Sequence, residues 1–266
     1  MKKIFLLLAF VMTVSVASAW RSNCEEGIVI MASKHFAPKT KLVVDRYLGS
    51  KYSDDVLYLH NLETKKKAPL TNELHYVHLD GDLQPMKVES GDALVALEAA
   101  LAVVSNYENT SDEEMTKALR TVINLMSDIH HLSNYRIESI PYSMQTYKFK
   151  RQPQDYGKTK NEIQTTVWQK IWWNFSGRYT GFSGEFWAYE MNLCKGKMKD
   201  EYSKGTLREW VSENGAVAAM YLERFHPDYV VPPFEFNSLE DVNYEMMARC
   251  SFRLAAILNS TITEQF

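Results

Sequence analysis

One segment, residues 91–107 (GDALVALEAALAVVSNY), places the strongest limit on how this chain can fold. Apolar side chains would lie on nearly every side of a helix through it, and good helix formers fill its length. A helix of that kind is typical of a protein core and not of a surface. We therefore expect a buried helix here, with other helices packed around it.

A second helix is expected directly after a polar turn. Ser111 and Glu114 have the spacing of a capping box, which marks a helix start. The apolar stripe that follows is Met115, Ala118, Leu119, Val122, Met126 and Ile129. The polar residues on the opposite side are Asn124, Asp128 and His131. On periodicity alone, we interpret this polar side as a solvated helix face.

The C-terminal part predicts a third helix at residues 241–259. Its apolar stripe is Met247, Cys250, Leu254 and Leu258. Strict alternation does not extend over any long stretch, and β-like stretches such as residues 74–79 are short. Residues 230–236 (VVPPFEF) are interpreted as a proline-stiffened connector. These patterns together predict an all-α domain with long irregular loops.

Aromatic residues recur at spacings of three and four in the second half of the chain. They are Trp168, Trp172, Phe175, Tyr179, Phe182 and Phe186. Such a stripe could be a platform for stacked bases. Aromatic side chains at helical spacing more often bury their large area, so we assign the stripe to the core.

The N-terminus has the pattern of a signal peptide. Lys2 and Lys3 precede an apolar run at residues 4–11, and small residues end at Ala19. The apolar run is shorter than the roughly 20 residues that a membrane-spanning helix needs. We therefore expect cleavage between Ala19 and Trp20, a secreted or periplasmic protein without stable membrane insertion, and a monomer of one domain at residues 20–266.

Charge and cysteine content narrow the function classes. The formal net charge of −3 becomes −5 when the two lysines of the signal peptide are removed, and residues 65–67 are the longest basic run. This composition argues against a high-affinity binder of duplex nucleic acid. Three cysteines in an oxidising compartment allow at most one intramolecular bridge. We expect Cys194 to pair with Cys250, which leaves Cys24 unpaired.

An ordered set of motifs runs through nearly the whole mature chain. It consists of Trp20 at the processed N-terminus, ASKHFAPKTKLVVDRYLG, LHYVHLD, SDIHHL, VWQ, WAYE and RLAAILN. This set resembles the zinc-dependent single-strand-specific nucleases of the S-one/P-one family, which are related in fold to bacterial phospholipase C. The resemblance implies a multi-helix fold and three zinc ions held by histidines, aspartates and the N-terminal tryptophan.

The resemblance identifies candidate ligands in the first half of the chain. The α-amine and carbonyl oxygen of Trp20 would bind a metal, and Glu25 stands where the family has a histidine ligand. Asp54 falls on the aspartate that binds metal and acts near the attacking water, and Asp55 is the alternative residue for this position in the alignment. His75 falls on a histidine ligand of the same metal.

The second half of the chain departs from the family pattern. Asp128 is retained in the helix motif, but Asn124 and Asn134 occupy its two histidine positions. Thr165 and Gln169 replace the histidine and aspartate around the last conserved tryptophan. Because neutral amides and hydroxyls are poor zinc ligands, one of the three metals would lose all its side-chain donors.

The resemblance therefore implies a reduced site. Asp54, His75 and Asp128 are the smallest set that could hold a catalytic zinc, which needs roughly three protein ligands and an open position. We expect one or two zinc ions at most, or none. Tyr76 lies where the family stacks a nucleobase, and His130 and His131 are interpreted as surface or supporting residues.

Two functions remain open at this point. The preferred one is a divergent, exported relative that has lost catalysis and binds a nucleotide, glycan or protein in the ancestral cleft. The alternative is an active metallophosphoesterase that cleaves single-stranded nucleic acid or nucleotide phosphates, with Asp54 activating water and His75 and Asp128 fixing the metal.

Overall fold

The computed structural model describes residues 20, 22–49, 51–52, 54–56, 58, 72–89, 91–144, 148–151, 163–168, 172 and 181–263. The signal peptide predicted at residues 1–19 lies outside these residues. The longer elements are helices, so the all-α prediction is confirmed. They are α1 (Ser22–Ser33), α2 (Pro38–Leu48), α4 (Ala93–Ser105), α5 (Asp112–His130), α7 (Gly184–Lys195), α8 (Lys199–Tyr202), α9 (Leu207–Arg224) and α10 (Pro233–Thr263).

Short elements connect these helices. The 3₁₀ turns are η1 (Asn72–His75), η2 (Tyr107–Asn109), η3 (Leu132–Asn134), η4 (Pro141–Met144) and η5 (Gly196–Met198). The strands are β1 (Val77–Leu79), β2 (Tyr135–Ile137), β3 (Lys148–Arg151), β4 (Gln164–Val167) and β5 (Val230–Val231). β1 and β2 pair in parallel, while β3 pairs antiparallel with β4 and parallel with β5.

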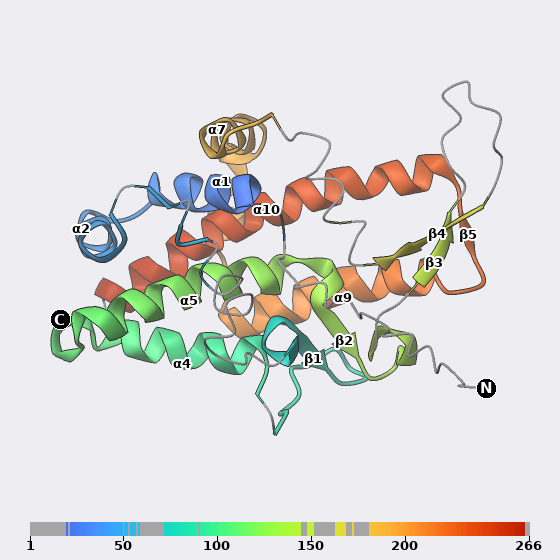
Figure 1. Cartoon of the computed structure of the whole chain (residues 1–266), viewed down its shortest axis with the longest axis horizontal. Helices are drawn as coiled ribbons and strands as arrows, with labels where there is room; N and C mark the ends of the chain where they lie inside the picture. Colours follow the sequence, from blue (N-terminus) through green and yellow to red (C-terminus); the bar gives the residue numbers. More distant parts are fainter. Residues whose placement is uncertain are drawn as a thin grey trace, which may run out of the picture.

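The long C-terminal helix α10 organises the molecule. It crosses the view in Figure 1 between the pair α1 and α7 on one side and the pair α4 and α5 on the other, and it contacts all four. Its predicted stripe is buried at Met247, Cys250, Leu254 and Leu258. The core is thus built around α10, with helices packed against two of its sides.

The apolar helix α4 is confirmed as a helix but lies at the edge of the molecule. Its N-cap Asp92 accepts a hydrogen bond of 3.0 Å from the backbone N–H of Val95. Leu94 and Leu97 are buried, whereas Val95 and Val103 are 43% and 36% exposed. The expectation of a helix buried on all sides is therefore wrong, because α4 packs mainly against α5 along one face.

The neighbouring helix α5 is more deeply buried than expected. Ser111 caps its start as predicted and exchanges hydrogen bonds with Glu114. Its apolar stripe is buried, but so is the polar side formed by Asn124, Asp128 and, just after the helix, His131. The interpretation of a solvated face is wrong, because α5 contacts α4, α2, α9 and α10.

Two further expectations need correction. Residues 230–236 are not a connector, since α10 starts at Pro233; proline is favoured at the first position of a helix, where its missing N–H has no partner to lose. The predicted Cys194–Cys250 bridge is absent, and none of the three cysteines forms a disulfide. Cys250 is buried and donates to the carbonyl of Met126 at 3.4 Å, whereas Cys194 is exposed on α7.

The described helices were also compared with the requirements of a membrane span. None of them combines the length and apolar character needed to cross a bilayer.

Candidate functional site

Two of the predicted ligands meet in the core. His75 ends η1 and Asp128 lies in the last turn of α5, and the imidazole Nδ1 is 2.8 Å from the carboxylate Oδ2. Both side chains are 4% exposed. The parallel pairing of β1 with β2 brings the two together, because β1 follows η1 and β2 follows α5 and η3.

The other carboxylate oxygen of Asp128 has a partner as well. Asn134 donates through its side-chain amide to Oδ1 of Asp128 at 3.0 Å and to the backbone carbonyl of the same residue at 3.3 Å. Asn134 stands at a predicted histidine position. Its amide N–H is a donor toward the carboxylate, so this contact between two protein side chains forms without a metal.

The chain of contacts continues to His131. Ser133 Oγ lies 2.7 Å from Nδ1 of His131 and 3.3 Å from Oδ1 of Asn134. Complete burial lowers the pKa of His131 to about 3, so the ring is neutral near pH 7. His131 is 2% exposed and His130 is 0% exposed, so the interpretation of surface histidines is wrong, and the role of supporting residues agrees with their contacts.

Trp20 closes the cluster from the other end of the chain. Its indole meets the His131 ring edge to face with centroids 5.2 Å apart, and its Nε1 donates to Oδ1 of Asn243 on α10 at 2.6 Å. Its backbone N–H donates to Oε1 of Glu25 on α1 at 3.1 Å. Trp20 is completely buried and Glu25 is 5% exposed.

Cys250 links the two halves of this arrangement. Burial is the main cause that raises the pKa of its thiol; Ser127 and Arg253 oppose this shift, and the carboxyl groups of Glu25 and Asp128 add to it. Both carboxyl groups therefore act on the same buried region next to α10. We call the set Trp20, Glu25, His75, Asp128, His131 and Asn134 the polar core cluster.

The predicted catalytic residue is not part of this cluster. Asp54 is exposed, whereas its neighbour Asp55 is 2% exposed and faces α5. Arg120 donates to Oδ1 of Asp55 at 2.7 Å, and the Asn124 amide donates to the Asp55 carbonyl at 2.8 Å. Burial raises the pKa of Asp55, and Arg120 opposes that shift. Asn124, at a predicted histidine position, thus holds the turn that carries Asp55.

The predicted base-stacking residue already has a partner on its ring. The guanidinium carbon of Arg136 lies 3.9 Å from the ring centroid of Tyr76, which is a cation–π contact. Arg136 also donates to the backbone carbonyl of Ser143 at 2.6 Å. Tyr76 is 8% exposed, so a base could reach this face only by displacing the guanidinium.

The aromatic stripe divides into two parts. Trp168 and Trp172 are buried at 2% and 1% exposure, as the core assignment predicts. Phe182 and Phe186 instead line a pocket, and Phe186 is 40% exposed. Phe175, Tyr179 and Gln169 lie outside the described residues, and Thr165 is exposed on β4.

A catalytic zinc ion needs about three protein ligands arranged around one point. Among the described residues, no group of three or more His, Cys, Asp or Glu side chains is placed to hold a metal. Asp54 is on the surface, and His75 and Asp128 contact each other. As arranged here, these side chains do not form the cage of about three protein ligands that a catalytic zinc needs.

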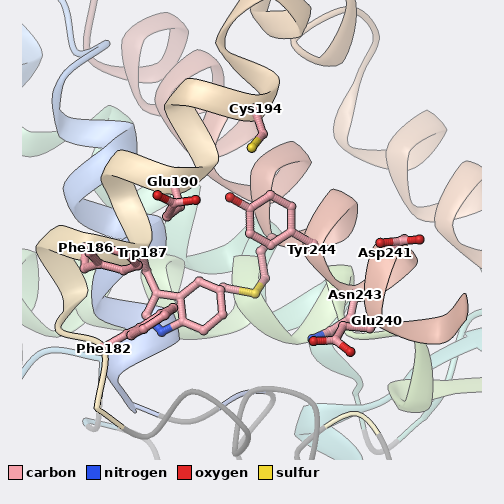
Figure 2. A pocket seen from close by; sticks show the side chains of 10 residues that line it. Phe182, Phe186, Trp187, Glu190, Cys194, Glu240, Asp241, Asn243 and Tyr244 are labelled. Atoms are coloured by element: carbon pink, nitrogen blue, oxygen red, sulfur yellow. The ribbon is translucent and has the colours of Figure 1, made fainter. Parts of the chain in front are cut away.

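A pocket of about 450 Å³ adjoins the cluster between α7 and α10. Asn243, which holds the indole of Trp20, is one of its lining residues. Figure 2 shows aromatic, acidic and sulfur-containing side chains around it. Sequence analysis missed this pocket because α7 and α10 are distant in the chain, and only the aromatic run at residues 182–187 marked one wall.

Comparisons with known proteins add no assignment to this site. No protein-family model matches the chain, and no curated protein matches it. The resemblance to the nucleases therefore depends on the sequence motifs alone.

Proposed function

We propose that this chain is an exported, divergent relative of the S-one/P-one nucleases that has lost catalysis and acts as a binding protein. In this proposal the former ligand positions Trp20, Glu25, His75, Asp128 and Asn134 belong to the polar core cluster, which stabilises the fold. The observation that carries it is that both carboxylate oxygens of Asp128 contact side chains of the protein, His75 and Asn134.

The donor chemistry supports this proposal. A carboxylate that binds zinc directs a lone pair at the metal, whereas Asp128 accepts from an amide and contacts an imidazole. The amides of Asn124 and Asn134 donate to protein oxygens. Buried polar groups are stabilised when they have hydrogen-bond partners, so this cluster can serve the fold without a metal.

The surroundings of Tyr76 also favour binding over nuclease activity. Arg136 covers its ring and donates to a backbone carbonyl, so neither side chain is available to a nucleotide without rearrangement. The predicted water-activating carboxylate, Asp54, is exposed to solvent and outside the cluster. A nuclease would need the water-activating carboxylate and the metal ligands to act together on one phosphate.

One observation favours the alternative of a reduced zinc enzyme. Glu25 and Asp128 act on the same buried thiol, and signal-peptide cleavage would turn the Trp20 backbone N–H beside Glu25 into an α-amine. A histidine that contacts a carboxylate through Nδ1, as His75 does, is also a common arrangement behind zinc ligands. These groups would bind zinc, and zinc would supply an activated water for phosphate-ester hydrolysis.

Elemental analysis of the processed protein distinguishes the two functions. The protein is expressed with its own leader, the Trp20 N-terminus is verified by mass spectrometry, and bound zinc and cleavage of single-stranded DNA and RNA are measured. We expect substoichiometric zinc and no cleavage with added zinc. Stoichiometric zinc that is lost in Asp128→Asn and kept in Asp54→Asn would contradict the proposal, as would cleavage abolished by Asp128→Asn.

A further inference from the structure

The pocket between α7 and α10 has a continuous aromatic wall. The ring centroids of Phe182 and Phe186 are 4.1 Å apart, and those of Phe182 and Trp187 are 5.6 Å apart. Trp187 then meets Tyr244 of α10 at 6.2 Å. The four rings thus follow one another from the exposed edge at Phe186 to the opposite helix, as Figure 2 shows.

The charged residues described in the lining of the same pocket are all acidic. Glu190 comes from α7, and Glu240 and Asp241 come from α10. Among the described residues that line the pocket there is no lysine or arginine. Lys195, the basic residue that follows Cys194 on α7, has its ammonium 3.7 Å from the carboxylate of Glu245, outside the lining.

Tyr244 connects the aromatic wall to the acidic side. In Figure 2 its phenol oxygen points toward the side of the pocket that carries Glu190 and Cys194. Burial is the main cause that raises the pKa of this phenol, and Cys194 and Glu190 raise it further. The hydroxyl is therefore protonated at neutral pH, and the ring adds no charge of its own to the pocket.

We propose that this pocket binds a small organic cation, with the positive group held against the aromatic rings and balanced by Glu190, Glu240 and Asp241. An aromatic face attracts a positive charge through its quadrupole, most strongly where water is excluded. A cavity of about 450 Å³ suits a small molecule. This site is independent of whether the polar core cluster binds zinc.

The wall chemistry selects this ligand class over others. A metal ion would need several oxygen, nitrogen or sulfur ligands in close geometry, and the described residues contain no such group. An anion would be repelled by the three carboxylates. A neutral apolar molecule would gain from contact with the rings but would gain nothing from the negative charge of the carboxylates.

The test is a titration of the processed, full-length protein with tetramethylammonium chloride by isothermal calorimetry. tert-Butanol is the uncharged probe of similar shape, and sodium chloride at matched ionic strength controls for screening. We expect saturable binding of tetramethylammonium and at least about fivefold weaker binding of tert-butanol, the factor expected for a cation–π contact of ordinary strength.

Matched variants on α7 locate the site. Phe186→Ala and Glu190→Gln change lining residues and should each weaken tetramethylammonium binding about fivefold. Tyr189→Ala and Glu185→Gln change exposed residues of the same helix outside the lining and should leave binding unchanged. Circular dichroism checks that each variant is folded, and Glu190→Gln decides the test if Phe186→Ala does not fold.

Three results would overturn the proposal. They are equal affinity for tert-butanol, equal loss in the lining and control variants, and the absence of saturable binding. The first would make the pocket a general apolar site, and the second would place the binding elsewhere.

Discussion

The imidazole Nδ1 of His75 lies 2.8 Å from Oδ2 of Asp128, although the two residues are 53 positions apart in the chain. This contact joins the end of η1 to the last turn of α5, and Asn134 completes it on the other carboxylate oxygen. The pair is therefore a tertiary contact that fixes where two segments meet. Its removal should therefore lower the free energy of unfolding of the whole domain.

Replacing Asp128 should destabilise the protein strongly. Asp128→Ala removes the partner of His75 and Asn134 inside the core, and breaking a buried pair of this kind costs about 3–5 kcal/mol of unfolding free energy. Asp128→Asn keeps the shape and should cost less. Urea denaturation monitored by circular dichroism measures both. A loss below about 1 kcal/mol in Asp128→Ala would mean that the contact is not maintained in solution.

The two aspartates of the turn near α5 should differ in effect. Asp55→Ala removes the acceptor of Arg120 and should cost about 1–3 kcal/mol of unfolding free energy, because a buried acceptor and its volume are lost. Asp54→Ala changes an exposed side chain and should stay within about 0.5 kcal/mol. Thermal and urea unfolding of the two variants compare them directly. An equal loss of unfolding free energy in the two variants would show that Asp55 is not the buried aspartate.

Stability should fall as the pH is lowered through the histidine range. The pKa of His131 is about 3 in the folded protein, and the ordinary histidine pKa is about 6.5, so below pH 6.5 the unfolded chain binds a proton that the native protein does not. The stabilisation is fully present above about pH 6.5 and is lost as the pH falls toward 3. Each such histidine contributes a slope of about 1.4 kcal/mol per pH unit in that range.

The variant His131→Gln isolates this contribution. Glutamine does not titrate and can still contact Ser133, so the slope of unfolding free energy against pH should become smaller by about 1.4 kcal/mol per pH unit. Urea unfolding between pH 4.5 and 7.5 gives the slope for both proteins. His130 is buried with its pKa lowered as well, and it should account for part of the remaining slope. An unchanged slope in His131→Gln would contradict the burial of a neutral ring.

Thiol labelling should separate the three cysteines. Cys194 is exposed and should react with a disulfide reagent in the native protein, whereas the buried Cys24 and Cys250 should react only after unfolding. The measurement is the absorbance of the chromophore that the reagent releases, with and without urea. A Cys194–Cys250 bridge would instead leave only Cys24 to react in the unfolded protein. Cys194→Ser is the control, since it should remove the native reaction alone.

The sequence predicted the helices better than their surroundings. Periodicity located the stripe of α5 and its cap at Ser111, and it located α4. It did not show which helix is central, so the polar side with Asp128 was expected in water and the face with Val95 in the core. Periodicity reports that two faces differ, while solvent exposure depends on neighbours that the sequence does not name.

The candidate site was predictable to a different degree. The motif resemblance drew attention to Trp20, Glu25, His75 and Asp128, and the structure brings these four residues into one buried region. It could not decide between Asp54 and Asp55, because adjacent residues in a turn exchange inside and outside with a small change in backbone direction. For the pocket of α7 and α10, the sequence marked only the aromatic wall, since the acidic side comes from residues on two helices far apart in the chain.

The hydrogen bond between the Trp20 indole and Asn243 spans 223 positions. Ribosomes make Trp20 before Asn243, so this bond can form only after the chain has been synthesised as far as Asn243 in α10. A chain shortened before α10 would lack the acceptor and the helix behind it. The segment around Trp20 would then lack its packing partner, and we expect such a shortened chain to be more susceptible to proteolysis.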